Sequence, residues 1–286
     1  MTISSITFPF SSLGRETTIA LEGIYAAGEA ILEVYKENFT TMLKAQQEPV
    51  TEADLRSNKI LLAALAKTKI PVLSEEKHDS GKRLEHSTVW IIDPLDGTKE
   101  FIKRNDEFAV MVALVEDTIP ILGIVYQPTS GLLYLARKGE GVFQKTESGW
   151  KKLFVSNFRE ISKARVVLSK SHLAEKDKQF INHIGINNSS QKGSAGLKVG
   201  LICAGEAEFY FNPSDKLKEW DTAAAYCMIT EAGGEITDLF GNPLKYNQKD
   251  VFHRKGILVS NGVLHSFLVK KLQKFYALKD DSSALS

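Results

Sequence analysis

The stretch VWIIDPLDGT at residues 89–98 is the part of the sequence that says most about the fold. Its first residues are β-branched or aromatic and form a short apolar run, which predicts a buried strand. Pro94 has no N–H group to donate to a sheet ladder, so we expect the strand to end there. Asp93 would then lie at the end of the strand, and Asp96 in the loop just beyond it.

The two aspartates of this stretch indicate a metal site. Carboxylates held so close repel each other unless a cation lies between them, and oxygen ligands suit a hard ion such as Mg²⁺. Gly97 and Thr98 follow, and they would open a helix or turn whose free N–H groups can receive a phosphate. Together these are the parts of a phosphoryl-transfer centre. Taken alone, the same run of residues is equally typical of a surface turn, so the interpretation depends on the rest of the chain.

The whole sequence narrows the class of protein. It has 286 residues, of which 43% are apolar and 25% charged, as in a globular protein of one large domain or two modest ones. A net charge of +1 gives no sign of a nucleic-acid or membrane partner. Two cysteines exclude a disulfide framework, residues 1–14 lack a secretory pattern, and the longest apolar run, 109–115, is too short to span a membrane. We expect a soluble, cytoplasmic protein.

The first part of the chain reads as two helices followed by an antiparallel meander. Apolar residues recur at helical spacing in residues 16–37, a polar loop occupies 40–49, and Thr51 with Asp54 resembles a capping box that opens a second helix. Glu75 directly follows a short strand at 70–74, so it and Asp93 should lie at the same edge of a sheet. The further strands are expected at 108–116, 120–127, 131–137 and 141–145.

The second part alternates between strands and helices, which predicts a layered α/β unit. We expect a division into an N-terminal half, residues 1–155, and a C-terminal half, residues 156–286. The expected strands are 164–169, 207–211, 235–239 and 256–260, and the expected helices are 175–184, 197–204, 221–232 and 263–276.

Several further residues have both a functional and a structural interpretation. Asp54 and Asp221 each lie at the start of an expected helix, where a carboxylate commonly caps free N–H groups, but either could also serve a metal site. Ser194 and Lys198 belong to a Gly-Ser loop that opens a helix; this arrangement can bind phosphate or can be a flexible loop with a solvated lysine. The six histidines show no spacing typical of a zinc site.

Three motifs in this order resemble the inositol monophosphatase superfamily, a group of lithium-sensitive, magnesium-dependent phosphatases. They are SEE at 74–76, DPLDGT at 93–98 and WDTAA at 220–224 followed by Gly233-Gly234, and the resemblance covers nearly the whole chain. It implies a five-layered αβαβα sandwich. It also implies that two or three Mg²⁺ ions are held by Glu75, Asp93, Asp96, Asp221 and the backbone carbonyl of Leu95, and that Asp54 and Thr98 orient and deprotonate the attacking water.

Within this superfamily, SKSH at 169–172 looks like the nucleotide-binding loop of the 3′(2′),5′-bisphosphate nucleotidases of the CysQ type. The implied reaction removes the 3′-phosphate from adenosine 3′,5′-bisphosphate, a by-product of sulfate activation. Ala195 stands where many members carry a second serine, and Asn212 where several carry an arginine, so substrate identity is less determined than chemistry. The implied substrate contacts are Glu75, Leu95, Asp96, Gly97, Thr98, His172, Ser194, Lys198 and Asp221.

Two other interpretations remain open from the sequence. One keeps the chemistry and changes the substrate to an inositol phosphate or another sugar phosphate. The other is a non-catalytic magnesium-binding regulatory protein on the same fold, for which the complete set of carboxylates gives no support. The partner expected in all but the last case is a small phosphorylated molecule, and the protein is expected to be a monomer or a homodimer.

Overall fold

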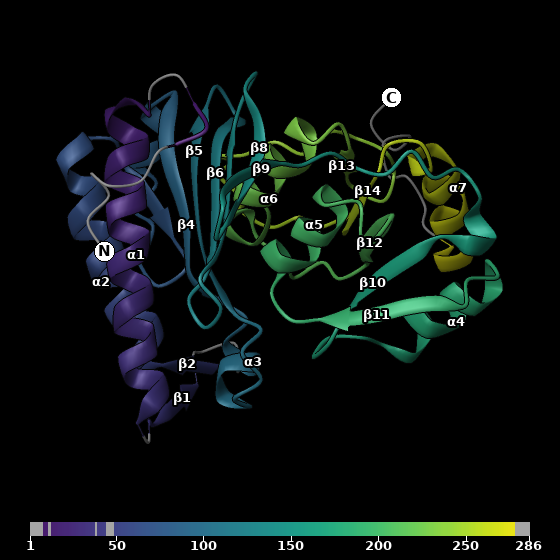
Figure 1. Cartoon of the computed structure of the whole chain (residues 1–286), viewed down its shortest axis with the longest axis horizontal. Helices are drawn as coiled ribbons and strands as arrows, with labels where there is room; N and C mark the ends of the chain where they lie inside the picture. Colours follow the sequence, from purple (N-terminus) through teal and green to yellow (C-terminus); the bar gives the residue numbers. More distant parts are fainter. Residues whose placement is uncertain (1–7, 11–12, 38, 44–48, 278–286) are drawn as a thin grey trace.

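The chain folds into five layers, as the superfamily resemblance implies (Figure 1). The structure is a computed structural model that describes residues 8–10, 13–37, 39–43 and 49–277. Most of the N-terminal stretch inspected for a secretory pattern, residues 1–14, lies outside these ranges. In order, the layers are a helix pair, a seven-stranded sheet, a second helix pair, a five-stranded sheet and a third helix pair.

The first layer consists of α1 (Gly14–Lys36) and α2 (Glu52–Leu65), which pack on each other and on one face of the larger sheet. The apolar stripe of α1 is buried there, with Ile24 and Ile31 fully inaccessible. The polar loop predicted at 40–49 is partly wrong, because β1 (Thr41–Leu43) and β2 (Pro49–Thr51) pair antiparallel; residues 44–48 lie outside the described residues.

The seven-stranded sheet runs in chain order from β3 to β9. β3 and β4 are parallel, with Ser74 opposite Ile92, and the other neighbours are antiparallel, which confirms that the ends of β3 and β4 share one edge. The hairpin strand β9 was not expected. The strands are β3 (Val72–Ser74), β4 (Thr88–Asp96), β5 (Ala109–Glu116), β6 (Ile119–Gln127), β7 (Leu132–Arg137), β8 (Gly141–Thr146) and β9 (Gly149–Lys152).

Pro94 does not end its strand, contrary to the sequence expectation. β4 continues to Asp96, and its pairing with β5 shifts register between Asp93 and Asp96, so the proline lies in a bulge. A bulge leaves one residue unpaired, and this accommodates the missing N–H group of proline. The Pro94 carbonyl accepts a hydrogen bond from Ser57 Oγ at 2.7 Å, which ties the bulge to α2. The short helix α3 (Thr98–Ile102) follows.

The central layer, α5 (Ala195–Cys203) and α6 (Glu219–Glu231), packs between the two sheets and contributes to a core shared by both. Close approach is possible because the contacts use glycine and alanine. A Cβ atom at Gly196 would lie 2.8 Å from side-chain atoms of Met111 and Val125, and one at Gly123 would lie 2.4 Å from the Ala224 carbonyl oxygen.

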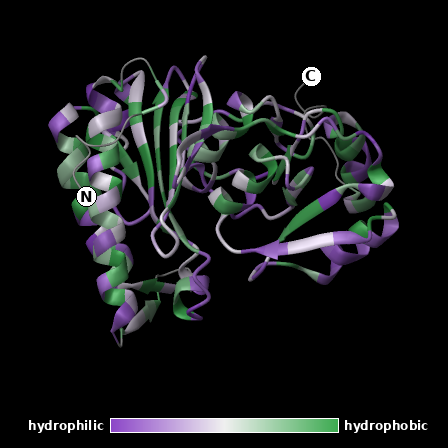
Figure 2. Cartoon of the chain, viewed as in Figure 1, coloured by the Kyte–Doolittle hydropathy of each residue, from purple (hydrophilic) through white to green (hydrophobic). Residues whose placement is uncertain are grey.

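The five-stranded sheet has the order β11-β10-β12-β14-β13, and α4 (Glu175–His183) and α7 (His265–Tyr276) cover its outer face. The edge strand β11 (Asn188–Lys192) was missed because it is polar throughout, which is visible beside the apolar β10 (Figure 2). The remaining strands are β10 (Arg165–Ser169), β12 (Phe209–Asn212), β13 (Glu235–Thr237) and β14 (Ile257–Ser260).

The two sheets are joined by the segment from residue 153 to residue 164, and the division into halves at residue 155 stays a prediction. Within the described ranges, no helix is both long enough and apolar enough to cross a membrane.

Candidate active site

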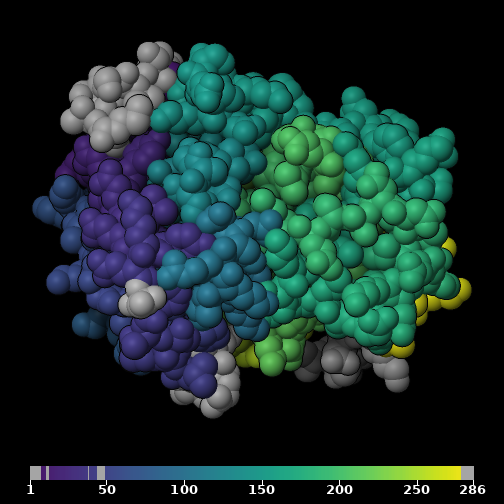
Figure 3. Space-filling view, turned by 60° about the horizontal axis from the view of Figure 1, so that its bottom comes forward, coloured from purple at the N-terminus to yellow at the C-terminus, as the bar shows by residue number. Residues whose placement is uncertain are grey.

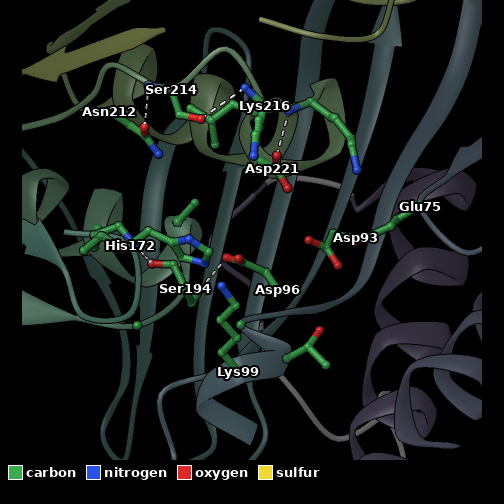
Figure 4. Close-up of a pocket in the computed structure, with 18 of the residues that line it drawn as sticks. Glu75, Asp93, Asp96, Lys99, His172, Ser194, Asn212, Ser214, Lys216 and Asp221 are labelled. Atoms are coloured by element: carbon green, nitrogen blue, oxygen red, sulfur yellow. Dashed lines mark hydrogen bonds between the residues drawn. The ribbon is translucent and has the colours of Figure 1, made fainter. Parts of the chain in front are cut away.

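A pocket of about 930 Å³ lies where the edge of the larger sheet faces the C-terminal half (Figure 4). It is lined by all but one of the residues expected to form the site, although they come from segments up to some 150 positions apart. These lining residues are Glu75, Asp93, Leu95, Asp96, Gly97, Thr98, His172, Ser194, Lys198 and Asp221. Asp54 is the exception, and it lies behind Thr98.

The carboxylates of the pocket come from three structural elements. Glu75 follows β3, Asp93 and Asp96 flank the bulge of β4, and Asp221 lies in the first turn of α6, where it accepts a hydrogen bond from the Lys218 N–H at 2.7 Å. Asp221 therefore caps its helix and also lines the pocket.

Burial and the charges of neighbouring carboxylates disfavour the charged forms of Asp93 and Asp221. The Asp93 side chain is only 2% exposed and accepts one hydrogen bond, from the Leu95 N–H at 3.0 Å. Burial raises the pKa of Asp93 well above its usual range, and the charges of Glu75, Asp96 and Asp221 raise it further. Burial, followed by the charge of Glu75, has the same effect on the pKa of Asp221. A cation in the pocket would relieve both effects.

The donor set fits a hard divalent cation, because it consists of carboxylate oxygens with a backbone carbonyl. As the side chains stand, no three acidic, histidine or cysteine groups within the described ranges lie close enough together to enclose an ion. The orientation of the Asp96 side chain is one reason for this separation of the carboxylates. Its Oδ2 accepts hydrogen bonds from Ser194 Oγ at 2.5 Å and from the Gly196 N–H at 3.1 Å, and Figure 4 shows it directed at Ser194.

Asp54 and Thr98 form a hydrogen-bonded pair beside the carboxylates of the pocket. Asp54 Oδ2 accepts hydrogen bonds from the Thr51 N–H at 2.8 Å and Thr51 Oγ1 at 2.6 Å, so the capping box is confirmed. Its other oxygen, Oδ1, accepts a hydrogen bond from Thr98 Oγ1 at 3.0 Å. Burial raises the pKa of Asp54, although the hydrogen bonds from Thr51 and Thr98 oppose this. Thr98 opens α3 as expected, but with five residues this helix has only a small dipole.

The opposite wall of the pocket is built by the start of α5. Ser194 is the N-cap residue and adopts a positive φ of 58°, and its Oγ accepts a hydrogen bond from the Leu197 N–H. Lys198 is 4% exposed; its Nζ donates to the Ser194 carbonyl at 2.9 Å and lies 5.0 Å from the centre of the Tyr210 ring. Burial lowers the pKa of Lys198, and the charge of Asp96 partly restores it. His172 lies on the same wall (Figure 4).

Sequence reasoning missed several residues of the site. Lys99 and Lys216 line the pocket, and the only local signal was the position of Lys99 directly after Thr98. The ammonium group of Lys170, in the SKSH segment, lies 2.9 Å from the Glu107 carboxylate. No local sequence pattern marked Glu107 as a contact between the two halves, because its partners lie far away in the sequence.

One known protein family matches this chain over nearly its whole length. The model of the inositol monophosphatase family matches residues 14–276. The 3′(2′),5′-bisphosphate nucleotidase CysQ of Shigella flexneri is 37% identical over 241 residues, which cover 82% of this chain and 95% of that protein. The crystal structure of CysQ from Bacteroides thetaiotaomicron superposes with a TM-score of 0.74 at 31% identity, covering 88% of this chain and 99% of that one.

A third similar structure is the extragenic suppressor protein SuhB of Bartonella henselae. Its TM-score is 0.77 at 27% identity, with 90% of this chain and 97% of that one covered. Enzymes of the matching family use a divalent metal ion, typically Mg²⁺. The chain belongs to the inositol monophosphatase family.

Proposed function

We propose that this protein is a magnesium-dependent phosphatase that removes the 3′-phosphate from adenosine 3′,5′-bisphosphate, giving AMP and inorganic phosphate. The observation that carries the proposal is one pocket with two different walls. One wall, which we call the metal wall, holds the carboxylates expected for metal binding. The other wall holds His172, Ser194 and Lys198. The similarity to the CysQ nucleotidase, which extends over 95% of that protein, supports the choice of substrate.

The carboxylates of Glu75, Asp93, Asp96 and Asp221, with the carbonyl of Leu95, would hold two or three Mg²⁺ ions. Bound Mg²⁺ lowers the pKa of a coordinated water and neutralises charge on the phosphoryl group. The raised pKa values of Asp93 and Asp221 support this assignment, because these side chains are stabilised as anions only when a positive charge is near.

Asp54 and Thr98 would orient the attacking water and accept its proton. Thr98 Oγ1 donates its hydrogen to Asp54 Oδ1, so its lone pairs remain available to a water in the pocket. A proton taken from that water can pass through the hydroxyl group to Asp54. Because burial raises the pKa of Asp54, this carboxylate is a stronger base than a solvated aspartate.

The opposite wall would bind the rest of the substrate. Lys198 has a buried ammonium group that donates hydrogen bonds to the backbone carbonyls of Lys192 and Ser194, and it lines the pocket. A phosphate oxygen would be a stronger acceptor for this cation than a backbone carbonyl, because it is ionised. Lys99 and Lys216 add positive charge along the same cavity, which favours a substrate with more than one phosphate.

The experiment that tests this function measures phosphate release from adenosine 3′,5′-bisphosphate and from inositol 1-phosphate at matched Mg²⁺ concentrations, with lithium titrated into both. We expect Mg²⁺-dependent, lithium-inhibited release with the higher kcat/KM for the bisphosphate. A higher kcat/KM for inositol 1-phosphate would replace the proposed substrate. Metal binding without release from either compound would favour a regulatory role.

A further inference from the structure

Glu107 belongs to the N-terminal half, in the loop between α3 and β5, but its carboxylate contacts the C-terminal half. Its Oε2 accepts a hydrogen bond from the Gly193 N–H at 2.8 Å and lies 2.9 Å from Lys170 Nζ. Its Oε1 lies 3.6 Å from Lys192 Nζ. One side chain therefore connects the α3–β5 loop with the end of β10, the end of β11 and the loop that opens α5.

The two halves approach very closely at this point. A Cβ atom at Gly193 would lie 2.5 Å from both Glu100 Cγ and the Glu107 carbonyl oxygen, so only glycine fits there. Beside it, Glu100 accepts a hydrogen bond from Ser171 Oγ, which also accepts one from Lys103 Nζ at 3.1 Å. In the space-filling view, the blue surface near residue 100 lies directly against the green surface of the C-terminal half (Figure 3). We call this set of contacts, made by Glu100 and Glu107 to residues 170–171 and 192–193, the clasp.

The clasp joins segments that carry opposite walls of the pocket. On one side, Glu100 belongs to the helix that Thr98 opens, and that helix continues from the metal-wall residue Asp96. On the other side, Lys170 and Ser171 directly precede His172, and Gly193 directly precedes Ser194. Glu107 itself does not line the cavity. Its contacts therefore affect how far the two walls stand apart, rather than any contact with a ligand.

We propose that Glu107 is a positioning residue that sets the spacing between the metal wall and the wall that carries His172, Ser194 and Lys198. The inference rests on the proposed function, because only a substrate that reaches both walls depends on this spacing. A nucleotide with phosphates at two positions is such a substrate. Binding it with both walls correctly placed avoids the cost of ordering them on each binding event.

The carboxylate of Glu107 is well suited to this role, because it is 16% exposed and is only partly screened by water. Burial by itself would raise its pKa, but the hydrogen bonds from Lys170 and from the Gly193 N–H outweigh this, and the pKa is lowered. Glu107 is therefore charged at neutral pH and above, and in that range the clasp should not alter the pH profile of the reaction.

The test compares E107A and E107Q with the wild-type enzyme. Losing a charge-assisted hydrogen bond and its ion pairs should raise KM for adenosine 3′,5′-bisphosphate by about tenfold or more in E107A. E107Q keeps an oxygen acceptor for the Gly193 N–H, so its KM should be intermediate. The value of kcat, the pH profile and the Mg²⁺ concentration that gives half-maximal rate should stay close to wild type, because the metal wall is intact.

Glu231 offers a matched control. It is also a glutamate that connects the halves, since its carboxylate accepts hydrogen bonds from the Gly139 and Gly141 N–H groups at 2.8 Å each. It lies ten positions along α6 from Asp221, about 15 Å away, and does not line the pocket. E231A should leave KM unchanged. An unchanged KM in E107A, an equal rise in E231A, or a parallel fall in kcat and Mg²⁺ affinity would overturn the positioning role.

Hydrogen exchange tests the clasp independently of the proposed substrate. Absence of phosphate release from adenosine 3′,5′-bisphosphate by the wild-type enzyme would refute the proposed function. Hydrogen exchange of the backbone amides at residues 193–198 would still report on the clasp, and E107A is expected to accelerate it about tenfold or more relative to E231A. Equal exchange in the two variants would show that Glu107 does not hold this wall.

Discussion

Replacing Asp93 with asparagine should make the protein more stable than wild type when no metal is bound. In the presence of Mg²⁺, the same variant should be less stable than wild type. The wild-type side chain is 2% exposed, receives one hydrogen bond and is opposed by the charges of Glu75, Asp96 and Asp221. Asparagine keeps the oxygen that accepts the Leu95 N–H but removes the charge. Removing an uncompensated charge from such a site should add about 1–3 kcal/mol to the free energy of unfolding.

Magnesium should reverse the order of stability of D93N and wild type. A ligand present at 1,000 times its Kd stabilises the folded state by about 4 kcal/mol, which exceeds the gain from the substitution. In a chain of this size, about 4 kcal/mol corresponds to a rise in Tm of about 8–16 °C. D93N should lose most of that rise because it lacks a charged ligand, and its phosphatase activity should fall with it.

The assay is thermal unfolding of both proteins in a chelator and in saturating Mg²⁺. We expect the Tm of D93N to lie above that of wild type in the chelator and below it in Mg²⁺. A lower Tm for D93N in the chelator would contradict the idea that repulsion dominates at this position. An equal Mg²⁺-induced rise in both proteins would show that Asp93 is not a metal ligand.

Three further outcomes are expected. D54N should lower kcat by about 10²–10⁴-fold, because Asp54 accepts a hydrogen bond from the Thr98 hydroxyl group and is proposed to take up the proton of the attacking water. Steady-state kinetics will measure this fall, and thermal scans should show that the Mg²⁺-dependent stabilisation is retained. Burial raises the pKa of Glu219 from 4.5 to about 7, so the folded state keeps its proton where the unfolded state loses it, and between these pH values wild type should lose about 3 kcal/mol of stability. Denaturant titrations in a chelator should show a shallower loss in E219Q, and identical slopes would contradict the assignment. G123A should lower the Tm by about 2–10 °C in calorimetry, since its Cβ would lie 2.4 Å from the Ala224 carbonyl oxygen; an unchanged Tm would mean that α6 can shift at little cost.

Much of the site was predictable because its signals are local. Thr51 and Asp54 form a capping pattern within one turn, and the structure confirms that pattern. Glu75 and Asp93 each follow a strand, and parallel pairing of those strands was enough to place both at one edge. The roles assigned to these residues in catalysis and metal binding stay predictions.

What the sequence did not reveal depends on partners distant along the chain. The strand β11 has no apolar alternation because it is a polar edge strand, paired with β10 alone. Pro94 could not be assigned to a bulge without knowing the register of β5. Glu107 meets its partners 63 to 86 positions later, and no local pattern distinguishes it from a solvated glutamate.

The helix pair α5 and α6 has a consequence for how this polypeptide can be divided. A continuous hydrophobic cluster includes residues of both sheets and both helices, and Gly200 packs against the ring of Tyr134 from the larger sheet. Neither sheet thus possesses a complete interior of its own. The intact chain should therefore unfold as one cooperative unit. Fragments produced by cutting the connection at 153–164 would each expose an apolar surface, and they should regain the native structure only when they reassociate.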